Sequence, residues 1–564
     1  MSNPKAPMFE IDVAKLPSGS AAQAPDRGYR DLHEHIAELE RRGLLQRITR
    51  PIDKDSELHP LVRWQFVGGM AEKDRKAFIF ENIVDSSGRK YDMPVVVGAI
   101  AANREIYSVG MDAPVDDIQK KWDQAIANPI KPRTVEQAPC HEVVLTRQGL
   151  QGPGRGLDAL PIPVSTPGFD SAPTLTATNV ITKDPETGIQ NMGTYRAALK
   201  ACDRLVVRMA TRVGGAGGYQ HYLKHQKRGD KEMPIAIVVG CPPYVAFLGP
   251  QKLPIGVDEF DVAGGLAGGP INIVKAKTVD LMVPAEAEIV IEGFVDTEHV
   301  EPEAPFGESH GHVALEEFNM PMRVTAITHR KKAIIPSYIS QVAPSESSVI
   351  KRVAYEPLFL AHLRDQLSIK GVKRVALHEP LTGLLRVTTI VVSKGMPKTE
   401  VWRALYGAAF FKGDCGKICI AVNEDIDPDN ADAIFWAMAY RSNPVEDVQT
   451  VAHRGQGHGP KREHGGEEDS TLLIDATMKS DMPPLALPKK EYMERARAIW
   501  EELQLPALRP QPPWFGYSLG DWHREWDEAA ARAAKGQWME NGRISLSRQR
   551  TGLVPETKFR PDGD

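Results

Sequence analysis

Two short segments of the chain carry side chains that could do acid–base chemistry. Residues 301–312 read EPEAPFGESHGH and gather three glutamates and two histidines around a Pro-Phe-Gly turn, while residues 191–196 read NMGTYR and end on Arg196. An arginine between two carboxylates keeps one of them ionised, and burial raises the pKa of the other so that it can donate a proton. The segment therefore indicates a general acid–base site built from two of these carboxylates, one on either side of the turn. The alternative, a surface acidic loop, is the more common origin of such a segment.

Three other patterns lack the context that their chemistry needs. Gly516–Gly520 (GYSLG) matches a nucleophile elbow, but no apolar strand precedes it, and the only histidine that follows, His523, is too close to Ser518 to serve as its partner. His221 and His225 are four residues apart, without the glutamate of a zinc protease and without a cysteine pair, although one of them could bind another metal. Gly214–Gly218 (GGAGG) lacks the spacing of a dinucleotide loop. These motifs indicate neither a hydrolase, nor a zinc protease, nor a dinucleotide-binding domain.

The acidic segment needs a β-rich scaffold to hold it. Ile235–Val239, Ala287–Val295 and Arg323–His329 are β-branched runs separated by Gly and Pro, which predicts strands of a sandwich or barrel. The second of these runs ends just before residue 301. We therefore expect the acidic loop to follow directly on a buried strand.

Different patterns flank this β-rich region. A helix is expected near Asp31, because Asp31 and Glu34 form a capping box and Gly43 ends the pattern. Strand-like runs such as Met93–Ile100 follow it. Beyond Ser345, helical patterns alternate with apolar runs at Val387–Val392 and Ile418–Val422, which indicates a layered α/β unit. A helix is expected at Glu491–Leu503, before a tryptophan-rich tail that we expect to pack on the body or on a second subunit.

Composition narrows the class of protein. The 564 residues include 69 Lys and Arg against 74 Asp and Glu, a net charge of −5 that gives no reason to expect a nucleic acid partner. Hydrophobic residues make up 42% and charged residues 25%, as in ordinary globular proteins. No run of about 18 apolar residues occurs and no secretion signal is visible, so we expect no membrane span. Five scattered cysteines fit a reducing cytoplasm.

Several long motifs, in order, resemble the UbiD family of prenylated-FMN-dependent decarboxylases. The resemblance covers most of the chain from about Asp31 to Leu505. It rests on ITKDPETGIQNMGTYR, KAKTVDLMVPAEAEIVIEG, PEAPFGESHGH, NEDIDPDNADAIFWAMAYR and LLIDATMK.

The resemblance implies roles for individual residues. Arg196, Glu303 and Glu308 match the family's Glu–Arg–Glu/Asp constellation, with Glu308 as the acid that protonates carbon after CO₂ leaves. Its pKa is expected to be raised by an apolar pocket. The matching cofactor-binding positions are Asn191, Tyr195, Arg196, Gln220, His221 and Lys412.

The resemblance also implies cofactors. These are prenylated FMN as electron sink, a divalent metal (Mn²⁺, Mg²⁺ or Fe²⁺) on its phosphate, and K⁺. Asn191, His221 and Asn272 match the metal ligands. Asn272 stands where the family has a glutamate, so the loss of one negative charge is expected to weaken binding of the divalent metal ion.

The fold implied is a multidomain α/β (α+β) protein. It has an N-terminal α/β domain, a central split β-barrel that binds the flavin, and a C-terminal α/β domain with a terminal oligomerising helix. The expected boundaries are a flexible arm at 1–28, the N-terminal domain at 29–137, the barrel at 138–343, the C-terminal domain at 344–488, and the helix and tail at 489–564.

The function expected is a carboxy-lyase that reversibly decarboxylates an aromatic, heteroaromatic or α,β-unsaturated acid, with an aryl-CoA thioester as a further option. The expected partners are the acid and CO₂, a flavin prenyltransferase that supplies the cofactor, and further copies of the chain in a dimer or hexamer. Two alternatives remain: an ordinary FMN-binding split-barrel oxidoreductase, and a non-catalytic subunit of a multi-protein carboxylase.

Overall fold

The structure is a computed structural model. It describes residues 27–209, 217–251, 253, 257–303, 305–309, 311–314, 318–380, 385–413, 415–455, 468–479, 489–506, 508, 524–535 and 537–547. The chain divides into two compact units, Met1–Ala354 and Tyr355–Asp564. The division falls within α8 (Glu346–Ala361), near the expected boundary at 343/344, whereas the expected boundary at 137/138 lies inside the first unit.

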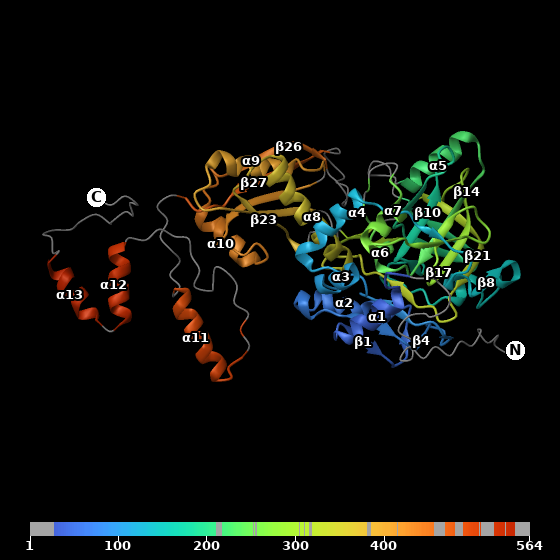
Figure 1. Ribbon diagram of the computed structural model, residues 1–564, viewed down its shortest axis with the longest axis horizontal. Helices are drawn as coiled ribbons and strands as arrows, with labels where there is room; N and C mark the ends of the chain where they lie inside the picture. The colour runs from blue at the N-terminus through green and yellow to red at the C-terminus, as the bar shows by residue number, and fades with distance from the viewer. Residues whose placement is uncertain are drawn as a thin grey trace. The chain divides into compact units, whose positions relative to one another are not determined.

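A ten-stranded sheet forms the centre of the first unit (Figure 1). Its main path runs in the order β11 (Gln190–Gly193), β10 (Thr178–Lys183), β14 (Glu232–Val239), β17 (Ile289–Asp296), β21 (Phe318–His329), β13 (Arg204–Val207), β12 (Ala197–Ala201) and β9 (Thr174–Leu175). Two further strands, β8 (Val143–Thr146) and β18 (Glu301–Pro302), pair with β21. All of these pairings are antiparallel. The three β-branched runs that predict strands are confirmed by β14, β17 and β21, although β17 begins two residues later than expected, at Ile289.

Both faces of this sheet are buried, because successive side chains of a strand point to opposite faces. On β14, Ile235, Ile237 and Val239 enter one hydrophobic core, and Ala236 and Val238 enter another. A strand packed on both faces is rigid and suits the positioning of functional side chains at its ends.

The first unit also contains smaller sheets and helices. The smaller sheets are β1 (Leu45–Ile48), β3 (Ala77–Phe80), β6 (Val95–Val97) and β22 (Ile335–Ser337); β2 (Ile52–Asp53), β4 (Ile83–Val84) and β5 (Lys90–Tyr91); β16 (Met282–Pro284), β15 (Asn272–Lys275) and β7 (Arg133–Thr134); and the pair β19 (Phe306–Gly307) and β20 (Val313–Ala314). The helices before α8 are α1 (Leu32–Arg41), α2 (Leu58–Val67), α3 (Arg104–Met111), α4 (Ile118–Ala127), α5 (Gly217–Arg228), α6 (Pro243–Ala246) and α7 (Glu259–Ala267). The capping box of Asp31 and Glu34 at the start of α1 is confirmed.

The second unit is a layered α/β domain, as its sequence pattern predicts. Its five-stranded mixed sheet has the order β23 (Val372–Leu377), β24 (Val387–Val392), β25 (Ile418–Asn423), β27 (Glu468–Asp475) and β26 (Val448–Gly455). Its helices after α8 are α9 (Lys398–Ala409), α10 (Ala431–Arg441), α11 (Lys490–Glu502), α12 (Arg524–Ala534) and α13 (Trp538–Ser547). The sheet has a core on each face, one shared with α9 and the other with α10 (Figure 1).

Some features noted in the sequence fall outside the described residues. These include residues 1–26 of the expected arm, residues 214–216 of the GGAGG motif, the GYSLG motif, and Trp514 and Trp522 of the tryptophan-rich tail. In the part of the chain that the structure describes, no helix is long and apolar enough to cross a membrane. All five cysteines are free.

Candidate active site

The arginine and two of the glutamates named from the sequence meet in one buried cluster. Arg196 lies between β11 and β12, Glu303 follows β18, and Glu308 follows β19. Arg196 Nε donates to Glu303 Oε1 at 2.5 Å, and its Nη1 donates to Glu308 Oε1 at 2.6 Å. Burial alone would lower the pKa of Arg196, but the two carboxylates outweigh burial and raise it. The sequence prediction that one arginine joins two carboxylates therefore agrees with the geometry.

A second arginine, Arg208, was not identified from the sequence. It follows β13 directly, and its Nη1 donates to Glu308 Oε1 at 2.6 Å, while its Nε lies 4.0 Å from Glu303 Oε2. Burial and the nearby charge of Arg196 lower the pKa of Arg208. The cluster thus holds two cations and two anions. A carboxylate that accepts charge-assisted hydrogen bonds from two guanidinium groups is favoured in its ionised form.

Neighbouring side chains fix the two acids in place. Glu303 is 2% exposed and also accepts a hydrogen bond from Asn319 Nδ2 at 3.3 Å. The Arg196 guanidinium lies 4.3 Å from the centroid of the buried Phe306 ring, a cation–π contact. Glu301, the third glutamate of the segment, instead pairs with Arg204 at the surface.

The Pro-Phe-Gly segment differs from the expected turn. Phe306 and Gly307 form strand β19, which pairs with β20, and the chain reverses after them. The reversal is closed by the N–H of Glu308, which donates to the carbonyl of His312 at 2.9 Å. Gly311, with a φ of 91°, supplies the left-handed conformation that such a tight connection needs. Glu308 is therefore the first residue of a hairpin connection. His310 lies outside the described residues.

The start of α5 brings together several of the expected cofactor-binding residues. A Cβ on Gly217 would lie 1.9 Å from Asn191 Oδ1, so Asn191 sits directly against the first residue of the helix. The hydroxyl of Tyr195 accepts a hydrogen bond from the N–H of Gly218 at 3.4 Å. His221 lies one turn further along the same face. Gln220 is on α5 as well but is exposed.

His221 is oriented like a metal-binding histidine. Its Nδ1 is hydrogen bonded to Thr182 Oγ1 at 2.8 Å, which leaves Nε2 as the nitrogen that can bind a cation. Burial lowers the pKa of His221 to about 4, so the ring is neutral near pH 7.

Glu259 was not identified from the sequence, but it lies beside the Asn191 segment. It is the first residue of α7, and its buried carboxylate interacts with the N–H of Met192 and with its own N–H. Burial raises its pKa to about 7. The only signal in the sequence was a pair of acidic residues, Asp258 and Glu259, at the start of a helix, which is a common capping pattern.

Asn272 lies in a different network. Its Oδ1 accepts from Arg133 Nε at 2.9 Å, its Nδ2 donates to Glu286 at 2.8 Å, and its N–H donates to the hydroxyl of Tyr29 at 2.9 Å. The side chain is fully buried on β15. Both ends of this amide are engaged by protein groups. Lys412 belongs to the second unit, where its ammonium lies 3.9 Å from the centroid of the Tyr355 ring.

Among the described residues, no three His, Cys, Asp or Glu side chains form a metal-binding group. A site built from Asn191, His221 and Glu259 needs the amide oxygen as its third donor. This set of oxygen and nitrogen donors, with one negative charge, fits a hard divalent cation.

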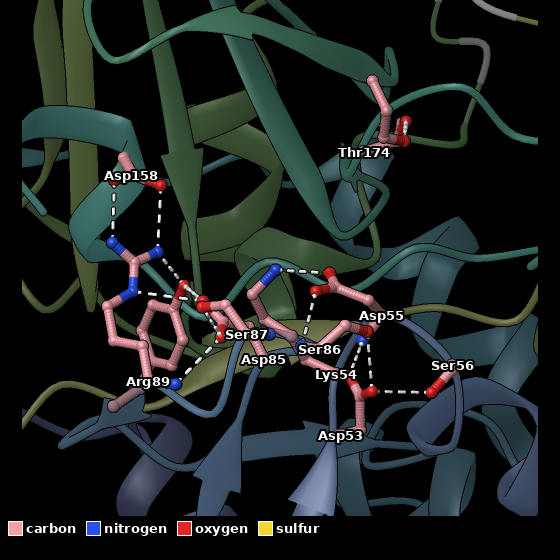
Figure 2. Close-up of polar contacts among 12 residues, drawn as sticks. Asp53, Lys54, Asp55, Ser56, Asp85, Ser86, Ser87, Arg89, Asp158 and Thr174 are labelled. Carbon is pink, nitrogen blue, oxygen red and sulfur yellow. Dashed lines mark hydrogen bonds and ion pairs between the residues drawn. The ribbon is translucent and has the colours of Figure 1, made fainter. Parts of the chain in front are cut away.

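A separate polar cluster in the first unit surrounds Arg89 (Figure 2). Arg89 donates to both carboxylate oxygens of Asp158, at 2.8 and 2.9 Å, and to Asp85 at 3.2 Å. Lys54 donates to Asp55 at 2.6 Å in the same view. These groups satisfy one another, which indicates a structural role.

Two family models match the chain. Residues 133–342 match the family model of the 3-octaprenyl-4-hydroxybenzoate carboxy-lyase Rift-related domain. Residues 349–476 match the model of the C-terminal domain of the same carboxy-lyase. Together the two models match more than half of the chain.

Relatives and solved structures extend the match to most of the chain. An uncharacterised protein of Synechocystis is 28% identical over 87% of this chain and 97% of its own length. The UbiD-class enzyme HmfF from Pelotomaculum thermopropionicum, solved with FMN, is 27% identical over 80% of this chain and 95% of its own, with a TM-score of 0.70. The 3,4-dihydroxybenzoic acid decarboxylase of Klebsiella pneumoniae, 23% identical over 80% of this chain and 94% of its own, shares the fold with a TM-score of 0.68. The chain belongs to the UbiD family of carboxy-lyases.

Proposed function

We propose that this chain is a reversible, non-oxidative decarboxylase of an aromatic, heteroaromatic or α,β-unsaturated carboxylic acid that uses prenylated FMN. The observation that carries the proposal is the buried cluster of Arg196, Glu303 and Glu308, which Arg208 extends. HmfF, to which the chain is similar, has been solved with FMN and, in an evolved dimeric form, with prFMN. A flavoprotein that only transfers hydride needs no such acid pair.

The residues around the start of α5 suit the flavin phosphate and its metal. We assign Asn191, His221 and Glu259 as metal ligands, with Glu259 in place of Asn272, because Glu259 lies beside the Asn191 segment and Asn272 is engaged elsewhere. Mn²⁺ is the expected ion, with Mg²⁺ or Fe²⁺ as substitutes and K⁺ nearby. The N-terminal end of α5 adds a favourable field for a phosphate. Tyr195, Gln220 and Lys412 remain proposed cofactor-binding residues.

The protein's own groups then act on the substrate. When bound, prenylated FMN supplies the electron sink for the electron pair that departing CO₂ leaves on carbon. Arg196 and Arg208 provide the positive charge that attracts and orients the substrate carboxylate. Glu303 balances that charge, because a carboxylate gripped too firmly by cations would resist the loss of CO₂. Glu308, once protonated, gives its proton to the carbon.

The same proposal implies partners, an oligomeric state and a cellular compartment for the protein. A flavin prenyltransferase would supply the cofactor, and the chain would assemble as a homo-oligomer, either a dimer or a hexamer. Free cysteines at all five positions fit the reducing conditions of the cytoplasm.

One experiment separates the proposal from the two alternatives. The chain is co-expressed with a flavin prenyltransferase, its bound flavin is identified by mass spectrometry, and CO₂ release is followed with 2-furoate, 3,4-dihydroxybenzoate and trans-cinnamate. Prenylated flavin with CO₂ release, or with exchange of labelled CO₂, supports the proposal. Unmodified FMN without CO₂ release points to an oxidoreductase. A purified protein without bound flavin points to a non-catalytic subunit.

A further inference from the structure

The turn at residues 165–170 is held firmly beside the catalytic cluster. The N–H of Val164 donates to the carbonyl of Lys54 at 3.2 Å, and the N–H of Thr174 donates to the carbonyl of Pro163 at 3.2 Å. Lys54 and Thr174 are both visible in Figure 2, where Lys54 is fixed by Asp55. Because both ends of the segment are anchored, the turn between them has a defined position.

Asp170 closes this turn and faces the catalytic cluster. Its Oδ2 accepts a hydrogen bond from the N–H of Thr166 at 2.8 Å. The N–H groups of Ser165 and Gly307 and the charge of Arg196 also act on its carboxylate. Asp170 is half-buried and follows the exposed Phe169, so it lies between solvent and the residues that precede Glu308.

Among the residues of this region that the structure describes, four buried polar atoms have no hydrogen-bond partner. They are Asp170 Oδ1, Ser165 Oγ, Thr166 Oγ1 and Gln341 Nε2. A Cβ on Gly307 would lie 2.8 Å from both Thr166 Oγ1 and Gln341 Cγ, so these side chains touch the residue immediately before Glu308. Gln341 is only 1% exposed. Buried polar atoms without partners are rare and costly, and ordered water is their usual partner.

We propose that Asp170 is the residue that returns a proton to Glu308, through water held by Ser165, Thr166 and Gln341. The inference rests on the proposed function, in which each turnover consumes one proton. Asp170 Oδ1–H gives its proton to a bridging water, and that water gives a proton to the carboxylate of Glu308. Asp170, now ionised, regains a proton from solvent. Overall, one proton from solvent replaces each CO₂ on carbon, and no oxidant or reductant takes part.

The electrostatics of Asp170 suit this task. Burial raises its pKa above that of free aspartate, although Arg196 and three backbone N–H groups act in the opposite direction. A carboxyl with a raised pKa holds its proton more tightly than a free aspartate does, which favours the protonated form that this route needs. Arg196 is the charged group that faces both Asp170 and Glu308.

An infrared titration tests the link between the two acids without turnover. The carbonyl stretch of protonated carboxyls is followed from about pH 3 to 8 in the wild-type protein, and Asp170→Asn identifies the band of Asp170. We expect that band to titrate above the range of free aspartate and to shift in Glu308→Gln. The matched control, Glu301→Gln, removes the nearby surface carboxylate that pairs with Arg204 and should leave the band unchanged.

Kinetics on the cofactor-loaded enzyme give the second readout. For whichever of the three acids named above is turned over, Asp170→Asn should lower kcat about tenfold or more with little change in KM, since proton transfer steps contribute about 10²–10⁴-fold. Asp170→Gly should regain part of its kcat on addition of formate, a small acid that can replace the missing carboxyl. Asp158→Asn, which removes a carboxylate in the separate cluster of Figure 2, should leave kcat unchanged.

The outcomes separate this inference from the proposed function. The proton route is overturned if the Asp170 band titrates in the range of free aspartate and does not shift in Glu308→Gln. It is also overturned if formate cannot restore the kcat of Asp170→Gly, because a purely structural carboxylate would not be rescued. If the wild-type enzyme decarboxylates none of the three acids while the infrared coupling is present, the proton route is supported and the proposed function fails for those substrates.

Discussion

Arg208 Nη1 lies 2.6 Å from Glu308 Oε1, the same oxygen that accepts a hydrogen bond from Arg196. One carboxylate oxygen is therefore held by two guanidinium groups, one from the connection between β11 and β12 and the other from the residue that follows β13. This contact fixes the position of Glu308. Under the proposed function each turnover consumes one proton, so the proton that Glu308 would donate must enter the site during each cycle.

Arg208→Lys tests the second guanidinium. Lysine keeps the positive charge but lacks the planar guanidinium group. In Arg208 one nitrogen of that group contacts Glu308 while another lies near Glu303. Loss of a charge-assisted hydrogen bond is worth about 1.5–3 kcal/mol, so kcat/KM should fall about 10- to 100-fold. Arg204→Lys is the matched control, because Arg204 is the first residue of β13, which Arg208 follows, and it pairs with the surface residue Glu301. Equal losses in the two variants would contradict a role for Arg208.

Glu308→Gln tests the proton donor. A glutamine oxygen can still accept hydrogen bonds from both arginines, but the side chain cannot donate a carboxyl proton. Decarboxylation should fall at least about 100-fold while the flavin stays bound, which absorbance of the purified protein and CO₂ release measure together. Turnover close to that of the wild-type enzyme would rule out Glu308 as the donor. Glu301→Gln should keep full activity.

The metal assignment predicts different effects for Glu259 and Asn272. Glu259→Gln removes the negative ligand, so Mn²⁺ retained after dialysis should fall at least about tenfold, as measured by electron paramagnetic resonance. Asn272→Ala should leave bound Mn²⁺ unchanged but lower the free energy of unfolding by about 1–3 kcal/mol, since Arg133 and Glu286 lose their partner. A larger loss of Mn²⁺ in Asn272→Ala than in Glu259→Gln would reverse the assignment.

Gly217 should tolerate no side chain. A Cβ there would lie 1.9 Å from Asn191 Oδ1, so Gly217→Ala must displace that amide and with it a proposed metal ligand. We expect reduced retention of Mn²⁺ and of flavin. Gly269→Ala is the control, because a Cβ at Gly269 meets nothing within 4 Å. Normal metal content in Gly217→Ala would show that Asn191 takes no part in binding.

Buried histidines should make the protein acid-sensitive. Burial lowers the pKa of His35 from 6.5 to about 4, and its Nε2 donates to the carbonyl of Ala99 at 2.6 Å. Between these two pKa values the unfolded chain binds more protons than the folded one, so the free energy of unfolding must fall as pH drops from about 6.5 to about 4. In urea unfolding at several pH values, His35→Gln should show a smaller fall than the wild-type protein. His299→Gln, at a side chain 77% exposed, should match the wild-type protein.

The parts of the site that sequence could predict are those encoded by short-range patterns. Glu303 and Glu308 stand five residues apart in one distinctive segment, and the strand before them is plain from its β-branched residues. The expected turn was misplaced by a few residues, because Phe306 and Gly307 pair with β20 and only Gly311 has the backbone conformation of the reversal.

The residues missed are those whose meaning depends on distant partners. Arg208 ends an apolar strand, and nothing within its own segment indicates a contact 100 residues away. Glu259 resembles any acidic residue at the start of a helix, and only the fold brings it to Met192. Asn272 shows the opposite case. Its local motif predicts a metal ligand, but in the fold its amide is hydrogen bonded to Arg133 and Glu286.

In the proposed reaction Glu308 holds a proton when the substrate binds, so Arg196, Arg208 and Glu303 leave one net positive charge in the cluster. A substrate carboxylate neutralises that charge, whereas CO₂ and a decarboxylated product carry no charge. The affinity of the site for the products should consequently be lower than its affinity for the substrate, so that decarboxylation favours product release. Carboxylation has the opposite requirement: uncharged reactants must be supplied at high concentration, and the charged product is the species that stays bound.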